Sequence, residues 1–196
     1  MGNIGIIGRA RVGKDTTGEW FVNERGYRRV GFADPLKEAA LKLDPIVDVI
    51  EHGDYTESLS ELVGRVGWER AKDKNDEVRR ILQHLGSAIR SLDEDFWLRL
   101  ALKKTQEAND AGVPVVITDV RYRNEAASLV RAGFHLIHVE RPDVPRLDHE
   151  SENSLGPEDA RYLVMNDGDV PGLHKQLNRI WDEIHTIESL KHAARL

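Results

Sequence analysis

The chain of 196 residues is 40% hydrophobic and 32% charged, carries a formal net charge of −6 and contains no cysteine. Such a length and composition fit one globular domain, the negative charge argues against a nucleic-acid partner, and the missing cysteines exclude disulfides and thiolate metal sites. Because no apolar run approaches the roughly 20 residues that cross a bilayer and no export signal opens the chain, we expect a cytoplasmic protein without a membrane partner.

Short apolar or β-branched runs predict strands, and helical patterns separate them. The predicted strands are Ile4–Gly8, Arg29–Ala33, Val113–Asp119, His135–Glu140 and Tyr162–Asn166. The helical patterns cover Lys14–Arg25, Pro35–Leu43, Glu77–Leu92, Asp95–Ala108, Asn124–Ala132 and Val170–His185. Strands that alternate with helices imply a parallel sheet with helices on both faces.

The connection between the first strand and the first helix predicts a phosphate-binding loop. Gly8, Gly13 and Lys14 have the spacing Gly-x4-Gly-Lys, directly after an apolar strand and before a helix. In such a loop the backbone N–H groups and the positive helix N-terminus bind phosphate oxygens. The motif therefore predicts binding of ATP or GTP.

Two stretches interrupt the alternation of strands and helices. Residues 44–99 form a long, largely helical insert, and residues 142–158, rich in proline and charge, predict an irregular, lid-like flap. A phosphate-loop core with one insert after the second strand and a flap late in the chain is the layout of nucleotide kinases. We therefore predict a single kinase domain, residues 1–196, whose insert binds the acceptor nucleotide and whose flap helps to expel water.

Two carboxylates predict a magnesium site beside the loop. Asp119 ends the third predicted strand, where an acid orients Mg2+ in phosphate-loop proteins or, alternatively, caps the next helix. Asp15 takes the loop position that normally carries Ser or Thr, so Asp15 could bind the ion, directly or through water, or Thr16 could lie nearer to it.

Basic residues follow the strand-end acid. Arg121 lies in a loop that faces the ligand crevice of a parallel sheet, and a guanidinium there can bind a phosphate. Arg123 could equally be a solvated surface charge. Glu125 could hold Arg121 in position or start the next helix.

The helical pattern Glu77–Leu92 has one apolar stripe and an unusual polar face. That face carries Arg79, Gln83, Gly86 and Arg90, with Arg80 and Ser87 one step round. Glycine costs roughly 1 kcal/mol inside a helix, which is reasonable where something approaches the backbone closely. A carboxamide can pair with a base edge and guanidinium groups can hold a phosphate, so we predict an acceptor-binding face; a salt-bridged, solvated helix is the alternative. Trp97 could stack on a base or pack in the core.

An ordered set of residue blocks resembles the phage deoxynucleoside monophosphate kinases. The blocks are Gly13–Thr16, Ala33–Lys37, Gly67–Lys72, Val78–Gly86, Asp119–Arg121 with Glu125, His149–Glu152 and Asn166–Gly168. The resemblance implies a P-loop fold of three α/β/α layers with an adenylate-kinase-like strand order 2-3-1-4-5, and ATP as phosphoryl donor. It also implies a homodimer, small nucleotides as ligands, and the host cytoplasm if a phage encodes the chain.

The same resemblance implies roles for individual residues. The ATP-binding set is Arg11, Val12, Gly13, Lys14, Asp15, Thr16 and Asn166, the last near the adenine. The acceptor-binding set is Leu36, Lys37, Arg79, Arg80, Gln83, Gly86, Ser87, Trp97, Asp119, Arg121 and Glu125. The catalytic set is Lys14, Arg121 and Asp119, with Mg2+ near Asp15 and Asp119 and a flap arginine, Arg141 or Arg146, on the transferred phosphoryl group.

Two rival functions stay open at this point. The acceptor could be a hydroxyl of a deoxynucleoside or of dephospho-coenzyme A, with Asp34 as the general base; Asp34 could also be a helix N-cap. The chain could instead be a non-catalytic nucleotide-binding module, although the basic acceptor face argues against that.

Overall fold

The computed structural model describes residues 2–50, 55–144 and 154–194. The chain divides into two compact units. The core unit comprises Met1–Gly31 and Ala101–Leu196, and the insert unit comprises Phe32–Leu100. That the two units work as one domain stays a prediction.

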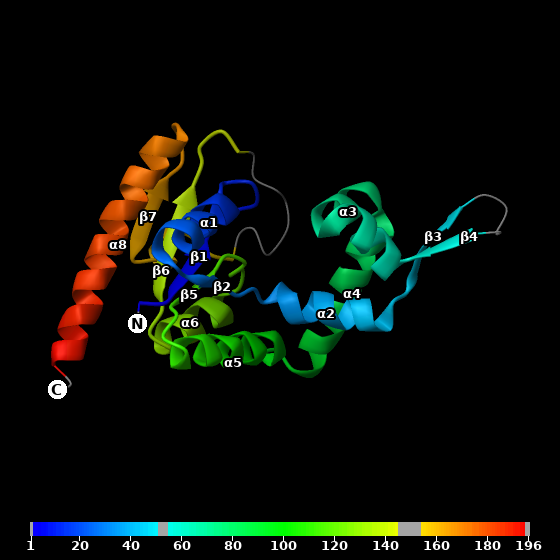
Figure 1. Ribbon diagram of the computed structural model, residues 1–196, viewed down its shortest axis with the longest axis horizontal. Coiled ribbons are helices and arrows are strands. Elements are labelled where there is room, and N and C mark those ends of the chain that lie inside the picture. Colours follow the sequence, from blue (N-terminus) through cyan, green and yellow to red (C-terminus); the bar gives the residue numbers. More distant parts are fainter. Residues whose placement is uncertain (1, 51–54, 145–153, 195–196) are drawn as a thin grey trace. The chain divides into compact units, whose positions relative to one another are not determined.

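The core unit contains a parallel sheet in the order β2-β5-β1-β6-β7 (Figure 1). Its strands are β1 (Ile4–Ile7), β2 (Arg28–Arg29), β5 (Val115–Ile117), β6 (His135–Glu140) and β7 (Tyr162–Met165). These five strands correspond to the five predicted from the sequence, so the order 2-3-1-4-5 and the α/β fold class are confirmed. The second strand is shorter than predicted, because Ala33 already belongs to the following helix.

Helices cover both faces of this sheet. They are α1 (Lys14–Arg25), α6 (Arg123–Arg131), the short η1 (Pro157–Asp159) and α8 (Val170–Ala193), with the end of α5 (Phe96–Asp110). α1 and α8 pack on one face, where Phe21 and Leu177 join the buried side chains of the strands. On the other face, Gly5 of β1 leaves room for Leu129 of α6. The apolar strands are thus buried on both sides, as a central parallel sheet requires.

The insert unit is largely helical, as predicted, but it also contains a β-hairpin that the sequence analysis did not predict. The hairpin consists of β3 (Ile46–Ile50) and β4 (Tyr55–Ser58), paired antiparallel. The helices are α2 (Ala33–Leu43), α3 (Leu59–Lys74), α4 (Asp76–Leu92) and the start of α5. Four of the five residues of β3, Ile46, Val47, Val49 and Ile50, are β-branched and favour a strand. Val47 is buried in the unit's own core, whereas Ile46 and Val49 are exposed.

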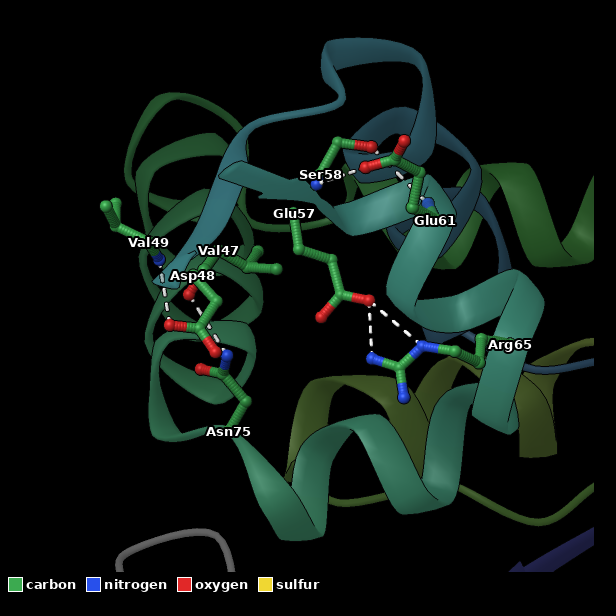
Figure 2. Close-up of polar contacts among 8 residues, drawn as sticks. All are labelled: Val47, Asp48, Val49, Glu57, Ser58, Glu61, Arg65 and Asn75. Carbon is green, nitrogen blue, oxygen red and sulfur yellow. Dashed lines mark hydrogen bonds and ion pairs between the residues drawn. The ribbon is translucent and has the colours of Figure 1, made fainter. Parts of the chain in front are cut away.

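Polar contacts join the hairpin to the helices that follow it (Figure 2). The buried carboxylate of Glu57 accepts hydrogen bonds from Nε and Nη2 of Arg65 in α3. Asn75, which precedes α4, donates from Nδ2 to the carbonyl of Val47 at 3.0 Å. Ser58 begins α3 with a reciprocal capping box to Glu61, which satisfies amides at the helix start. The hairpin is therefore an integral part of the insert unit, held by hydrogen bonds to α3 and to the start of α4.

The predicted flap falls partly outside the described residues. Arg146 and the block His149–Glu152 lie in residues 145–153, which are not described. Among the helices of the described ranges, none is long and apolar enough to cross a membrane.

Candidate active site

The loop between β1 and α1 depends on glycine at two positions. Gly8 and Gly13 have φ angles of 135° and 103°, which favour glycine. A Cβ on Gly8 would lie 2.4 Å from the carbonyl oxygen of Val139, and one on Gly13 would lie 2.4 Å from Nδ2 of Asn166. The loop is therefore pressed against the carboxyl ends of β6 and β7 and has no room for side chains there.

Lys14 begins α1 and folds back over the loop. Its ammonium group donates to the carbonyl oxygens of Gly8 at 2.7 Å and Arg9 at 2.6 Å. The helix is capped by Gly13, whose missing side chain leaves the cap without a side-chain hydrogen bond. The first amides of a helix have no intrahelical acceptor, so this end combines N–H donors, a positive dipole and a lysine.

An open pocket of about 300 Å³ lies at this helix end. It is lined by Arg11, Gly13, Lys14, Asp15, Thr16, Arg141 and Asn166. Of the two flap arginines considered from the sequence, the structure places Arg141 here. Three cationic side chains over a helix N-terminus make a site for an oligophosphate.

Two residues of the predicted ATP-binding set hold the loop itself. Val12 is fully buried in the core, so only its backbone is available to the site. Asn166 donates from Nδ2 to the carbonyl of Val12 at 2.8 Å. Asn166, predicted to lie near the adenine, therefore lies against the phosphate loop.

Asp15 is linked to the carboxyl end of β5. Its Oδ1 accepts a hydrogen bond of 3.2 Å from the hydroxyl of Thr118, the residue before Asp119. Gly18 of α1 lets this threonine approach, since a Cβ there would lie 2.3 Å from the methyl group of Thr118. The sequence analysis missed Thr118, although a polar residue at the end of an apolar strand is a usable signal.

Glu125 both fixes the backbone at Arg121 and starts α6. Its Oε2 accepts hydrogen bonds from the amides of Arg121 at 2.8 Å and Tyr122 at 3.0 Å, and its side chain is buried. The structure thus shows that Glu125 fixes the backbone of the exposed Arg121, while its role toward the acceptor stays a prediction. Arg123 is more than a solvated charge, because its Nε donates to the carbonyl of Ser154 at 3.0 Å.

The other predicted acceptor-binding residues belong to the insert unit. Arg79 donates to the carbonyl of Lys72 at 2.5 Å and to Asp73 at 2.8 Å. Arg80 forms an ion pair with Glu77, which lowers the pKa of that carboxyl. Lys37 lies 5.7 Å above the ring of Trp68. Gln83 and Ser87 are exposed on α4.

Gly86 is approached closely, as the sequence predicts, but by the protein itself. A Cβ there would lie 3.3 Å from Cδ2 of Leu36 in α2, and Nε1 of Trp97 donates to the Gly86 carbonyl at 3.4 Å. Trp97 is only 8% exposed and meets Phe96 edge-on. Of the two roles considered for Trp97, the structure shows core packing.

Comparison with known proteins identifies the group to which this site belongs. The sequence model of a family described as deoxynucleotide monophosphate kinase matches residues 47–177. The chain belongs to this kinase family. It is therefore a nucleotide kinase, that is, a phosphotransferase. Membership of this family implies ATP as the co-substrate.

Individual relatives of this kinase are viral. A protein of Acanthamoeba polyphaga mimivirus named "Putative deoxynucleotide monophosphate kinase" is 29% identical over 164 residues, which cover 78% of this chain and 81% of that protein. The uncharacterized protein ORF77 of Ictalurid herpesvirus 1 (strain Auburn) is 30% identical over 105 residues, 51% of this chain and 46% of that protein. A dephospho-CoA kinase from Campylobacter jejuni shares the fold, with a TM-score of 0.52, 13% identity, and coverage of 94% of this chain and 98% of that structure.

Magnesium, which such kinases typically use, fits the donors that this chain offers. Within residues 2–50, 55–144 and 154–194, no cluster of three or more His, Cys, Asp or Glu could hold a metal ion. Mg2+ with a nucleotide usually takes one or two carboxylates and fills its other positions with phosphate oxygens and water. Asp15 is hydrogen-bonded to Thr118, the residue before Asp119, so two carboxylates belong to neighbouring segments here. This agrees with a magnesium ion that takes only one or two ligands from the protein.

Two further residues, one in the loop and one on the neighbouring strand β6, were not predicted from the sequence. Arg9 donates from Nη1 to the carbonyl of Val144 at 3.1 Å, a contact across 135 residues of sequence. His138, in register with Ile7, is 6% exposed, and its Nδ1 has no hydrogen-bond partner in the described part of the chain. Burial lowers the pKa of His138, and Arg9 and Lys14 lower it too, against the acids Glu140 and Glu158. His138 is therefore neutral at pH 7.

Proposed function

We propose that this kinase transfers the γ-phosphoryl group of ATP to the phosphate of a deoxynucleoside 5′-monophosphate, giving the diphosphate and ADP. The observation that carries the proposal is the pocket at the N-terminus of α1, where Lys14 and Arg141 lie together. The family match and the mimivirus relative support the acceptor class.

The acceptor phosphate needs no general base. A phosphate monoester has a second pKa of about 6, so its oxygen is already an anion at neutral pH. This oxygen forms a bond to the γ-phosphorus while the bond from that phosphorus to the bridging oxygen of ADP breaks. Catalysis then depends on alignment and on stabilisation of the charge that spreads over the transferred group.

The basic residues of the core unit supply that stabilisation. Lys14 would exchange its loop carbonyls for oxygens of the β- and γ-phosphates, since an ammonium binds an anion more strongly than a neutral carbonyl. Arg141 and Arg121 would hold the transferred group, with the backbone of Arg121 fixed by Glu125. Asp15 and Asp119 would hold Mg2+, which neutralises phosphate charge when bound.

The exposed residues of α4 are the proposed acceptor site. Gln83 can pair with a base edge, and Arg79 or Arg80 can hold the acceptor phosphate. Both arginines already contact carboxylates, so acceptor binding would exchange one anionic partner for another. We propose small nucleotides as the ligands of this kinase, with a homodimer as its assembly.

The test is ADP production from Mg-ATP across a panel of acceptors. The panel holds the four common deoxynucleoside monophosphates, the matching ribonucleotides, thymidine and dephospho-coenzyme A. Turnover that is fast with at least one deoxynucleoside monophosphate supports the proposal. Turnover only with a hydroxyl acceptor would replace it with the rival kinase reaction, and ATP binding without any transfer would leave a binding module.

A further inference from the structure

A short turn after β6 carries Arg141 into the phosphate pocket. Arg141 is the first residue past β6, and the amide of Val144 donates back to its carbonyl at 3.3 Å. The side chain of Val144 packs against the buried core cluster of this unit. The turn is therefore anchored at its far end by an apolar side chain.

Arg9 joins the phosphate loop to this turn. Its own carbonyl accepts from Lys14 at 2.6 Å, while its guanidinium donates to the carbonyl of Val144 at 3.1 Å. One residue thus contacts both the lysine and the turn that delivers Arg141. Arg9 is half-buried and does not line the pocket itself.

These contacts separate two ways in which an arginine of the loop could act. A guanidinium inside the pocket would bind phosphate directly and independently of other residues. A guanidinium that donates a hydrogen bond to a backbone carbonyl acts differently, because it fixes the position of the segment that carries this carbonyl. A charged donor to a carbonyl is among the stronger hydrogen bonds, and small displacements of a catalytic group cost large factors in rate.

We propose that Arg9 is a positioning residue for the nucleotide: it holds the turn Arg141–Val144 so that Arg141 reaches the phosphates. The inference rests on the proposed function, in which Arg141 contacts the triphosphate of ATP. It assigns Arg9 no contact with the nucleotide.

A double-mutant cycle on ATP binding tests this positioning role. Arg9→Met keeps an unbranched apolar stem and removes the guanidinium, and Arg141→Ala removes the positioned group. The equilibrium Kd for Mg-ATP is measured by calorimetric titration without any acceptor for the parent, both single variants and the double variant. Arg179→Ala, an exposed arginine on α8, is the matched control and should leave Kd unchanged.

We expect each single variant to weaken ATP binding by about tenfold and the double variant to be no weaker than Arg141→Ala within about twofold. Arg9→Lys, which keeps a charged donor, should recover part of the loss. A double variant weaker by the product of the two factors, or an Arg9→Met variant that binds ATP like the parent, would overturn the inference.

The test of Arg9 can be distinguished from a wrong acceptor assignment and from a variant that does not fold. Because the titration contains no acceptor, it gives the same answer whether or not deoxynucleoside monophosphates are the substrates. If Arg9→Met does not fold, as judged by circular dichroism, the cycle is repeated with Arg9→Lys, for which the same lack of additivity is expected at smaller size. Additive losses in that cycle would equally reject the positioning role.

Discussion

The side-chain amide of Asn166 lies where a side chain on Gly13 would have to be. Nδ2 of Asn166 is 2.4 Å from the ideal Cβ position of Gly13 and donates to the carbonyl of Val12 at 2.8 Å. Residues 154 positions apart in the sequence thus close the phosphate loop from one side. This contact ties the shape of the loop after β1 to the carboxyl end of β7, which lies two strands away in the sheet.

Gly13→Ala should damage both stability and ATP binding. The φ angle of 103° disfavours alanine and its methyl group would collide with Asn166, so we expect a loss of roughly 1–3 kcal/mol of unfolding free energy. ATP affinity should fall by at least about tenfold because either the loop or the Asn166 amide that holds it must move. Gly26→Ala is the control: its φ is 69° but no atom lies within 4 Å, so only stability should fall. Titration calorimetry and urea unfolding measure both quantities, and unchanged ATP affinity in Gly13→Ala would contradict the packing argument.

Lys14→Met should abolish most phosphoryl transfer. Removing a single cationic donor from a site of developing charge typically costs about 10²–10³ in kcat, and methionine keeps the length of the stem. Steady-state kinetics with saturating Mg-ATP measure the loss. Lys175→Met, an exposed lysine on α8, should retain full activity. A kcat of Lys14→Met within about tenfold of the parent would remove Lys14 from the catalytic set.

Gln83→Ala should change acceptor preference more than overall rate. A neutral hydrogen bond to a base edge contributes about 1 kcal/mol, so the ratio of kcat/KM between two deoxynucleotides should shift by up to about tenfold. His84→Ala, also exposed on α4, should leave this ratio unchanged. Ratios that stay constant across all acceptors in Gln83→Ala would withdraw its proposed contact with the base.

Asp34→Asn distinguishes a phosphate acceptor from a hydroxyl acceptor. The helix α2 is capped by Phe32 without a side-chain bond, so Asp34 is a first-turn acid and the N-cap interpretation is wrong. A phosphate acceptor needs no base, so kcat should fall less than about tenfold, whereas loss of a general base costs about 10²–10⁴. Rates are compared at saturating acceptor. Near-complete loss of turnover in folded Asp34→Asn would favour the hydroxyl reaction.

Stability at acid pH should depend on the contact between His135 and Glu188. His135 Nε2 lies 3.0 Å from Glu188 Oε1, and Lys191 donates to the same oxygen at 2.6 Å. Burial raises the pKa of Glu188, but the hydrogen bonds from Lys191 and His135 outweigh it and bring the pKa down from 4.5 to about 2. Burial lowers the pKa of His135 despite Glu188, so the imidazole is neutral at pH 7 and Lys191 is the ionic partner.

Both shifts act in the same direction. A depressed pKa gives stability that is present above the ordinary value and is lost as the pH falls toward the folded value. Glu188 should therefore lose up to roughly 3 kcal/mol between pH 4.5 and about 2, and His135 should add a loss that starts near pH 6.5. Urea unfolding at pH 7 and pH 3 should show that Glu188→Gln is destabilised more at pH 7. The prediction would be wrong if the difference in unfolding free energy between the parent and Glu188→Gln were equal at pH 7 and pH 3. It would also be wrong if Asp182→Asn, at an exposed position, showed the same pH-dependent loss.

Local signals account for what the sequence predicted correctly. The bounds of α1 follow from Gly13 at its start and Gly26 at its end, both with positive φ. The strand order became predictable once the phosphate loop and its family resemblance fixed β1 at the centre. The hairpin was missed although Gly53-Asp54, a turn signal in the sequence, follows the β-branched run of residues 46–50.

Contacts between distant residues could not be predicted in the same way. The Arg9–Val144 hydrogen bond spans 135 residues and the Thr118–Asp15 bond spans 103. Thr118 itself is marked by its place at the end of an apolar strand, but no periodic or composition signal pairs the two partners of either bond, because each pairing depends on how strand ends meet at one edge of the sheet. Gly86 shows the converse: its small size was a correct signal of close approach, but the sequence could not tell that Leu36 makes it.

The most direct test follows the γ-phosphoryl group of labelled ATP during single-turnover reaction with each deoxynucleoside monophosphate, with products separated by chromatography. We expect the label in a deoxynucleoside diphosphate, ADP in equal amount, and neither product with Lys14→Met. Label found only in inorganic phosphate, or on a hydroxyl of the acceptor, would rule out transfer to the acceptor phosphate.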